Sequence, residues 1–195
     1  MADFEIAFDE TMIQEGGYVN DPDDRGGETY RGVARAFHGD WPGWKIVDQI
    51  KSDFPNDFKD HLDQSEAMDQ LVRDFYRAKF WNVIQGDEIS DQALANELFD
   101  TGVHQGTSSV VKYWQEALNL LNRNERDYPN IEIDGKAGVQ TLETTEKFYR
   151  RNPNSTALVK ILNIMQGHRY LELARKTPSQ KKFMHGWLKR VNLCP

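Results

Sequence analysis

Apolar side chains recur along most of the chain at intervals of three and four residues, the spacing of an α-helix that is buried along one face. The first stripe ends just before Gly16, and glycine is typical of the position that follows a helix. It consists of Phe4, Phe8, Met12 and Glu15. Later stripes predict helices around residues 68–75, 94–102, 110–121, 158–165 and 183–191, and we expect their apolar side chains to form the core.

Polar residues that favour helix N-caps stand before most of these stripes. The expected caps are Asp63 or Ser65, Ser90, Thr107, Ser155 and Thr177. Pro178 then takes the first position of the last helix, where a missing N–H is tolerated. That helix is expected to bury Phe183, Trp187 and Val191.

Two stretches break the helical period. Residues 18–33 are rich in turn formers, and Tyr18-Val19 and Thr29-Tyr30 flank them, which predicts a small hairpin with a loop from Asn20 to Glu28. Residues 38–60 carry four aromatic side chains and two prolines without a clear period, so we expect an ordered but irregular segment there. The whole pattern predicts a mainly α protein with one small β-hairpin after the first helix.

Composition excludes several classes of protein. The chain has 195 residues, of which 38% are hydrophobic and 28% charged, as in an ordinary globular protein. No apolar run approaches the roughly 20 residues of a membrane span, so we expect no membrane insertion. The acidic start, MADFEIAFDE, lacks the basic and apolar regions of a signal peptide, which predicts a protein that is cytoplasmic when synthesised.

Candidate metal and cofactor sites are also missing from the pattern. The one cysteine, Cys194, excludes a disulfide framework and a multi-cysteine metal site. The five histidines are not paired at metal-ligand spacing, and the glycine pairs lack the spacing and the lysine of a phosphate loop. We therefore expect no cofactor.

The net charge of −7 hides an uneven distribution. Residues 1–100 hold 9 basic and 23 acidic side chains, whereas residues 101–195 hold 15 basic and 8 acidic ones. This split indicates either two parts with different partners or an uneven solvated surface. The basic half has no Lys/Arg run and no nucleic-acid motif, so we expect no nucleic-acid partner, and an anionic cell-wall polymer would suit it equally well.

Glu15 carries the strongest chemical signal. It continues an apolar helix face at the end of the helix, where burial and the helix dipole both disfavour a carboxylate and raise its pKa. A carboxylic acid kept protonated near neutral pH is what cleavage of a glycosidic bond requires. The alternative is a glutamate at the edge of the core that reaches solvent or an arginine.

Asp24 and Thr29 follow Glu15 by nine and fourteen residues. A hairpin directly after the helix can bring both over a cleft, where a solvated Asp24 stays ionised and Thr29 holds a water or a substrate hydroxyl. Turn chemistry is the competing explanation for the aspartates of this loop, Asp21, Asp23 and Asp24. A calcium loop fits poorly, because Arg25 and Gly32 occupy ligand positions.

These residues carry a family resemblance. The stretch EGGYVNDPDDRGGETYRGV, from Glu15 to Val33, resembles the N-terminal signature of glycoside hydrolase family 108, the lysozyme-like N-acetylmuramidases. Its Glu/Asp/Thr spacing is also similar to that of phage-type lysozymes, one residue shorter before the Thr. Further along, YRAKFWNVIQGD and LANELFDTGVHQGTSSVVKYWQEALN resemble the middle of the family. IDGKAGVQTLE and FMHGWLKRV resemble its C-terminal peptidoglycan-binding region.

The resemblance implies a lysozyme-like helical fold that cleaves the β-1,4 bond between N-acetylmuramic acid and N-acetylglucosamine in peptidoglycan. Glu15 takes the position of the catalytic acid, and Asp24 and Thr29 take supporting positions. Residues 1–105 would form the catalytic region, and residues 106–195 a helical peptidoglycan-binding region packed on it as one compact unit. A lytic transglycosylase and a non-catalytic peptidoglycan-binding or secretion accessory module remain alternatives.

The resemblance also bears on where the protein acts. Some relatives are phage endolysins and others are called secretion activators, so opening the wall would aid lysis or secretion. Because the substrate lies outside the inner membrane, the resemblance implies action at the periplasm or cell wall after holin-like or non-classical export.

Four further residues are candidates for substrate binding: Tyr18, Tyr30, Asp100 and His104. The tyrosines, like Trp41 and Trp44, could stack on sugar rings, although core burial is the commoner fate of tryptophan. His104 stands where the family usually has Asn, four residues after Asp100 on the same helix face, so the two could pair. It lines the cleft or is a structural histidine. Asp134-Gly135 with Gly138 predicts a turn into a helix, or the wall-binding loop of the family.

Overall fold

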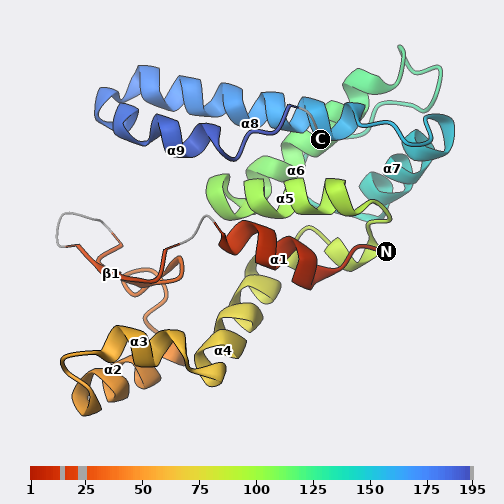
Figure 1. The fold of residues 1–195 in the computed structure, drawn as a ribbon. Helices are drawn as coiled ribbons and strands as arrows, with labels where there is room; N and C mark the ends of the chain where they lie inside the picture. The colour runs from red at the N-terminus through yellow and green to blue at the C-terminus, as the bar shows by residue number, and fades with distance from the viewer. Residues whose placement is uncertain (14–15, 22–25, 194–195) are drawn as a thin grey trace. The chain divides into compact units, whose positions relative to one another are not determined.

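The computed structural model describes residues 1–13, 16–21 and 26–193. It is built mainly of helices, with a small antiparallel sheet that follows the first helix (Figure 1), which confirms the predicted fold class. The chain divides into two compact units: unit 1 comprises residues 1–7 and 80–195, and unit 2 comprises residues 8–79. Within the described ranges, no helix combines the length and the apolarity that crossing a membrane requires.

The sheet of unit 2 contains the predicted hairpin and one strand more. β1 (Tyr18–Asn20) pairs antiparallel with β2 (Glu28–Tyr30), and Thr29 lies opposite Val19. β3 (Val33–Ala34) then pairs with β2 through a turn at Arg31 and Gly32, whose φ angles of 43° and 79° are those of a tight hairpin turn. The sequence pattern did not predict β3, because arginine seldom occupies a turn position with a positive φ angle.

The segment predicted to be irregular is in fact helical. It contains α2 (Gly43–Asp53) and α3 (Phe58–Asp63). Pro42 is the N-cap of α2 and Pro55 follows its C-cap, so the two prolines bracket a helix rather than prevent one. The expectation of an irregular segment over residues 38–60 was therefore wrong.

Unit 2 buries its aromatic side chains against α4 (Glu66–Tyr76), the predicted helix whose N-cap Ser65 accepts a hydrogen bond from the N–H of Met68 (3.4 Å). Trp41 and Trp44 are buried and pack edge to face at 5.4 Å between ring centres. Both indole N–H groups donate to backbone carbonyls, those of Leu71 and His38. The two tryptophans are core residues, which excludes the sugar-stacking role considered for them.

Unit 1 is a set of packed helices. After η1, a π-helical turn (Arg77–Trp81), and η2, a 3₁₀ turn (Gly86–Glu88), come α5 (Gln92–Gln105), α6 (Thr107–Leu121), α7 (Val139–Arg151) and α8 (Ala157–Lys176). α5 and α6 pack on each other and both pack on α8 (Figure 1). The predicted stripes of these helices are buried, among them Leu94, Leu98, Val110, Trp114, Leu118, Leu158 and Leu162. α1 (Phe4–Met12) adds Phe4, which packs edge-on against Trp81 and Phe99.

Several helix boundaries in unit 1 differ from those predicted. The N-caps of α6 and α8 are Gly106 and Thr156 rather than Thr107 and Ser155, and α5 differs at both ends. The N-cap of α5 is Asp91, whose carboxylate accepts from the N–H of Leu94 at 2.7 Å, whereas the hydroxyl of Ser90 donates to Glu146. Gly102 does not end the helix. It lies inside α5 against Val110 of α6, and Gly106, with φ of 91°, separates the two helices instead. A glycine that permits close packing of helices has been mistaken for a helix end.

The C-terminal segment is less regular than predicted. Thr177 and Pro178 do start a helical stretch, but it consists of η3, a 3₁₀ helix (Pro178–Phe183), followed by α9 (Met184–Leu188). Phe183 is 44% exposed rather than buried. Trp187 is half-buried and stacks on Tyr170 of α8 at 5.1 Å.

Gly86 provides a test of core packing in unit 1. A Cβ atom at this position would lie 2.3 Å from the fully buried ring of Trp81, which also donates its N–H to Asp87. We expect Gly86→Ala to lower the free energy of unfolding by about 1–3 kcal/mol, the usual cost of overpacking, as measured by urea denaturation. Gly186→Ala is the control, because nothing lies within 4 Å of that position and its stability should stay unchanged or rise slightly. Equal urea midpoints for Gly86→Ala and Gly186→Ala would contradict the close packing of Gly86 against Trp81.

Candidate active site

The residues predicted to cleave the glycan cluster in sequence around the hairpin of unit 2. Glu15 stands three residues before β1, and Asp24 stands between β1 and β2. Both lie outside the described residues, so their predicted roles stay predictions. The structure describes Thr29, Tyr18 and Tyr30, which belong to the strands themselves.

Thr29 occupies the middle of β2. Its side chain is half-buried, and its hydroxyl donates to the carbonyl oxygen of Gly27 at 3.3 Å, in the segment that leads from the β1–β2 loop into the strand. This bond orients the hydroxyl and uses its proton, so the oxygen can still accept a hydrogen bond from a water or a sugar hydroxyl.

Glu28, the residue before Thr29, is the centre of a polar cluster that the sequence analysis did not identify. Its Oε1 accepts hydrogen bonds from the Tyr18 hydroxyl at 2.7 Å and from Lys51 Nζ at 2.9 Å. Its Oε2 accepts from Arg35 at 2.8 Å, and Arg35 also binds both oxygens of Asp48 at 2.7 and 2.6 Å. The cluster therefore joins β1 and β2 to α2.

The donors around Glu28 decide its charge. Burial alone would raise its pKa, but the hydrogen bonds from Lys51, Arg35 and Tyr18 outweigh burial and hold the pKa below its usual value. Glu28 is thus ionised at neutral pH and cannot serve as a general acid. Its chemistry suits a residue that fixes the hairpin.

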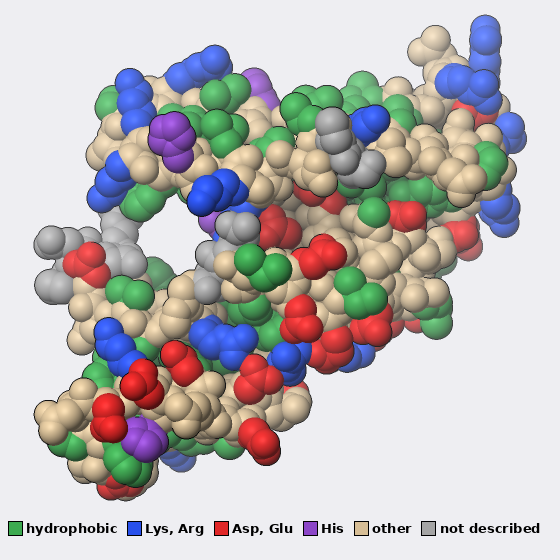
Figure 2. All heavy atoms as spheres, in the orientation of Figure 1, with side chains coloured by type: hydrophobic (Ala, Val, Ile, Leu, Met, Phe, Trp, Pro, Cys, Tyr) green, Lys and Arg blue, Asp and Glu red, His purple; other side chains and the backbone are tan. Residues whose placement is uncertain are grey.

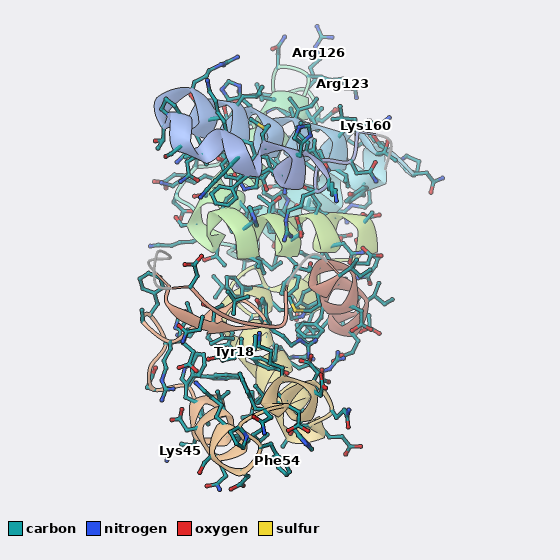
Figure 3. All side chains as sticks on the ribbon, turned by 60° about the vertical axis from the view of Figure 1, so that its left-hand side comes forward. Tyr18, Lys45, Phe54, Arg123, Arg126 and Lys160 are labelled. Carbon is teal, nitrogen blue, oxygen red and sulfur yellow. The ribbon has the colours of Figure 1, made fainter. Side chains whose placement is uncertain are left out.

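Tyr18 and Tyr30 have different surroundings, although they lie opposite each other in the sheet. Tyr18 is half-buried between the sheet and the helices α2 and α3 (Figure 3), with Lys51 5.3 Å from its ring centre and Phe58 packed edge-on at 4.9 Å. Tyr30 is only 1% exposed, and its hydroxyl donates to the carbonyl of Leu62 at 3.1 Å. A sugar ring cannot stack on a side chain buried in this way, so the expected substrate contact of Tyr30 is corrected to a core role.

Asp100 and His104 belong to α5 in unit 1, where each binds a residue of another element. Asp100 accepts from Arg190 at 2.5 Å and from Gln166 at 3.3 Å. The ring Nδ1 of His104 lies 3.1 Å from the hydroxyl of Tyr170. The protein atoms packed around the ring, and secondarily Arg190, lower the pKa of His104 to about 4, so this histidine is neutral at pH 7.

The same face of α5 carries Glu97, a buried carboxyl group that the sequence analysis overlooked. Thr101 donates to one of its oxygens at 2.9 Å, and Asn163 of α8 donates to the other at 2.6 Å. Gln166 donates to Thr101 at 2.8 Å and so links this group to Asp100. A signal was present in the sequence, because residues 97, 100, 101 and 104 are all polar and follow helical spacing, which places them on one face of the helix.

Glu97 has the protonation behaviour of an acid catalyst but not the exposure of one. Burial, with a smaller contribution from Asp100, raises its pKa to about 7. A raised pKa often marks a functional site. However, Glu97 is only 9% exposed and both of its oxygens accept hydrogen bonds from the protein. We therefore interpret Glu97 as part of the structural contact between α5 and α8.

Metal ligation finds no support in the described geometry. Over residues 1–13, 16–21 and 26–193, no three His, Cys, Asp or Glu side chains are grouped so that they could hold an ion.

Comparison with known proteins agrees with the sequence motifs. The family model described as glycosyl hydrolase 108 matches residues 8–106, and the model described as a predicted peptidoglycan domain matches residues 109–192. No curated protein matches the chain. The two family models together support a glycoside hydrolase whose role is to hydrolyse or bind peptidoglycan.

Among solved structures, the chain is similar to SagA of Brucella abortus, with a TM-score of 0.62 and 24% identity. The match covers 96% of this chain and 88% of the SagA chain. At this level of identity the likeness shows a shared fold, and it extends over both units.

Glu97 yields a prediction for the pH dependence of stability. Because its pKa is raised from 4.5 to about 7 on folding, the native state holds the proton more tightly, and the stabilisation is lost as pH rises from about 4.5 to 7. We expect the loss to approach roughly 3 kcal/mol. Glu97→Gln should remove this dependence, since an amide can accept from Asn163 and donate to Thr101 without ionising.

Thermal and urea unfolding of both proteins between pH 4.5 and 8 measure the effect. The variant should be the more stable protein at pH 8. Parallel stability curves for the two proteins would show that Glu97 does not titrate in this range.

Proposed function

The chain belongs to the glycosyl hydrolase 108 family, and on this basis we propose that it is an N-acetylmuramidase that hydrolyses the β-1,4 bond between N-acetylmuramic acid and N-acetylglucosamine in peptidoglycan. The observation that carries the proposal is the hairpin of β1 and β2. The hairpin lies within the region that the family model matches. In sequence, Glu15 precedes β1, Asp24 stands between β1 and β2, and Thr29 belongs to β2.

Glu15 is the proposed general acid. It follows α1 by three residues, and the carbonyl end of a helix disfavours a nearby carboxylate, which raises the pKa of such a group. A protonated Glu15 would give its proton to the glycosidic oxygen as the bond to the sugar breaks. The leaving sugar then departs as an alcohol rather than as an alkoxide.

Asp24 and Thr29 are the proposed partners on the water side of the reaction. An ionised Asp24 would stabilise the positive charge that develops on the sugar ring or activate the attacking water. Thr29 would position that water through the free lone pairs of its hydroxyl, which the bond to Gly27 already orients.

Glu28 and Tyr18 support this arrangement as positioning residues. The hydrogen bonds of Glu28 to Tyr18, Lys51 and Arg35 tie the strand of Thr29 to α2, and a sheet of strands this short needs such support.

The C-terminal region would hold the glycan while the site acts on it. We propose residues 1–105 as the catalytic region and residues 106–195 as the peptidoglycan-binding region, in line with the two family matches. Action on the wall would follow export from the cytoplasm through a holin-like pore or another non-classical route, and local opening of the wall would aid lysis or secretion.

The first test is Glu15→Gln. We expect the variant to keep its fold and to lose at least about a hundredfold in the rate of wall clearing, the usual scale for a missing general acid. Its thermal stability should stay equal or rise, because a carboxyl group in this position is disfavoured. Glu10→Gln, the same change at an exposed position of α1, is the control and should keep full activity. Near wild-type clearing by Glu15→Gln would exclude Glu15 as the acid.

Mass spectrometry of the released muropeptides distinguishes the alternatives in the same experiment. Reducing-end muramic acid supports hydrolysis, and anhydro-muramic acid would overturn it in favour of a lytic transglycosylase. Bound protein without released fragments would leave only a peptidoglycan-binding module.

The second test separates Asp24 from its neighbours. Asp24→Asn should lose most of the hydrolytic rate, and Thr29→Ala should lose less, because it removes one positioning hydrogen bond worth about 1 kcal/mol. Asp21→Asn and Asp23→Asn are matched controls in the same loop and should turn over a soluble glycan normally. Full turnover by Asp24→Asn would point to a mechanism that uses Glu15 alone. If only Asp21→Asn or only Asp23→Asn loses activity, that aspartate is the catalytic partner of Glu15.

A further inference from the structure

The loop between α6 and α7 has an unusual backbone. Three consecutive residues, Arg123, Asn124 and Glu125, have positive φ angles of 52°, 57° and 63°. Each non-glycine residue in this region costs about 1–2 kcal/mol, so the surrounding structure must hold the loop in place.

Buried polar side chains supply that support. Asn122 accepts from the N–H of Glu125 at 3.0 Å and donates to the side chain of Asn130 at 2.8 Å. Glu125 in turn accepts from the N–H of Asn130 at 3.1 Å. Tyr128, also buried, donates to the carbonyl of Leu118 at the end of α6. The loop is thus a built feature of unit 1 with a fixed conformation.

The loop uses one covered carboxylate to orient two arginines. Arg123 binds both oxygens of Asp127, at 2.7 and 2.5 Å, and Arg151 at the end of α7 approaches the same group at 3.5 Å. The side chain of Asp127 is 1% exposed, whereas those of Arg123 and Arg151 are 65% and 51% exposed. Two guanidinium groups therefore cover the carboxylate and keep their other N–H groups in solvent.

Arg126, three residues after Arg123 in the same loop, adds a third guanidinium group. It is exposed at the end of unit 1 that carries Arg123 (Figure 3), and it has no ion-pair or hydrogen-bond partner among the described residues. Figure 2 shows Lys and Arg side chains gathered over this loop and the adjoining helix ends. Over residues 122–130, Arg123 and Arg126 stand with two acidic side chains, Glu125 and Asp127, and Arg151 at the end of α7 brings the number of arginines to three.

We propose that Arg123, Arg126 and Arg151, here called the arginine cluster, bind the free carboxylates of peptidoglycan stem peptides. The guanidinium fork matches a carboxylate in two parallel hydrogen bonds, as the contact of Arg123 with Asp127 already illustrates. The cluster lies within residues 109–192, the region that matches a peptidoglycan domain. The choice of ligand rests on the proposed function, and the arginine cluster itself rests on the structure.

Sedimentation with insoluble peptidoglycan free of phosphate polymers tests the proposal. The full chain is mixed at 4 °C with native sacculi and with sacculi whose carboxylates have been amidated. Arg126→Gln is the cleanest variant, because it breaks no described contact, and Arg126→Gln with Arg151→Gln is the stronger one. Arg175→Gln is the matched control, since Arg175 is exposed in the last turn of α8, outside the loop.

We expect affinity for native sacculi to fall about fivefold for each exposed arginine removed, the scale of one exposed ion pair. Arg175→Gln should bind like wild type. Amidation should weaken the wild type at least as much as the double variant is weakened on native sacculi, and it should abolish the difference between the two proteins. Thermal unfolding verifies that each variant is folded, and the single variant carries the test if the double variant is not.

Two results would overturn the proposal: equal binding of all variants to native sacculi, or a loss that persists unchanged on amidated sacculi. Loss only on walls that bear phosphate polymers would likewise reject stem carboxylates in favour of phosphate. Cleavage of a short soluble glycan by the wild type is measured in parallel. If the protein does not cleave the glycan but its binding depends on the wall carboxylates, only the proposed hydrolase activity is refuted. If it cleaves the glycan but its binding does not depend on the carboxylates, only the proposed role of the arginine cluster is refuted.

Discussion

The charged hydrogen bonds of Glu28 are the interaction on which the hairpin of unit 2 depends. Strands of three residues are too short to be stable alone, and the edge of this sheet exposes much of its length. By accepting from Tyr18, Lys51 and Arg35, one carboxylate fixes both strands to each other and to α2. The position of Thr29, one residue further along β2, follows from that anchor.

Carboxyl groups in this protein have different roles because their surroundings differ. Glu28 faces two cations and stays ionised at the edge of the hairpin. Glu97 faces only neutral donors, Thr101 and Asn163, in a buried helix contact, and its pKa rises to about 7. Asp127 is covered by two arginines and organises a positive surface. The same functional group thus serves as an anchor, a buried neutral partner and an organiser of cations, according to its neighbours.

Polar contacts of this kind also determine how the C-terminal segment attaches to unit 1. Arg190 binds Asp100 on α5, and the N–H of Asn192 donates to Asn163 on α8. These bonds connect the segment to the network that contains Glu97 and Gln166. The apolar side chains of η3 and α9 are largely exposed, so hydrogen bonds and the stacking of Trp187 on Tyr170 account for much of the attachment.

The sequence by itself determined the features that depend on local spacing: most helices of unit 1, α4 of unit 2, the β1–β2 hairpin, and the family resemblance, which the family model confirms. Only the tertiary structure decided which polar residues are buried. Tyr30 was taken for a surface residue because its partner Leu62 lies 32 residues away, and Glu97 was overlooked because Asn163 lies 66 residues away. Periodicity reports which face of an element is apolar, whereas the burial and charge of a polar side chain depend on contacts between distant segments, which the spacing of residues does not encode.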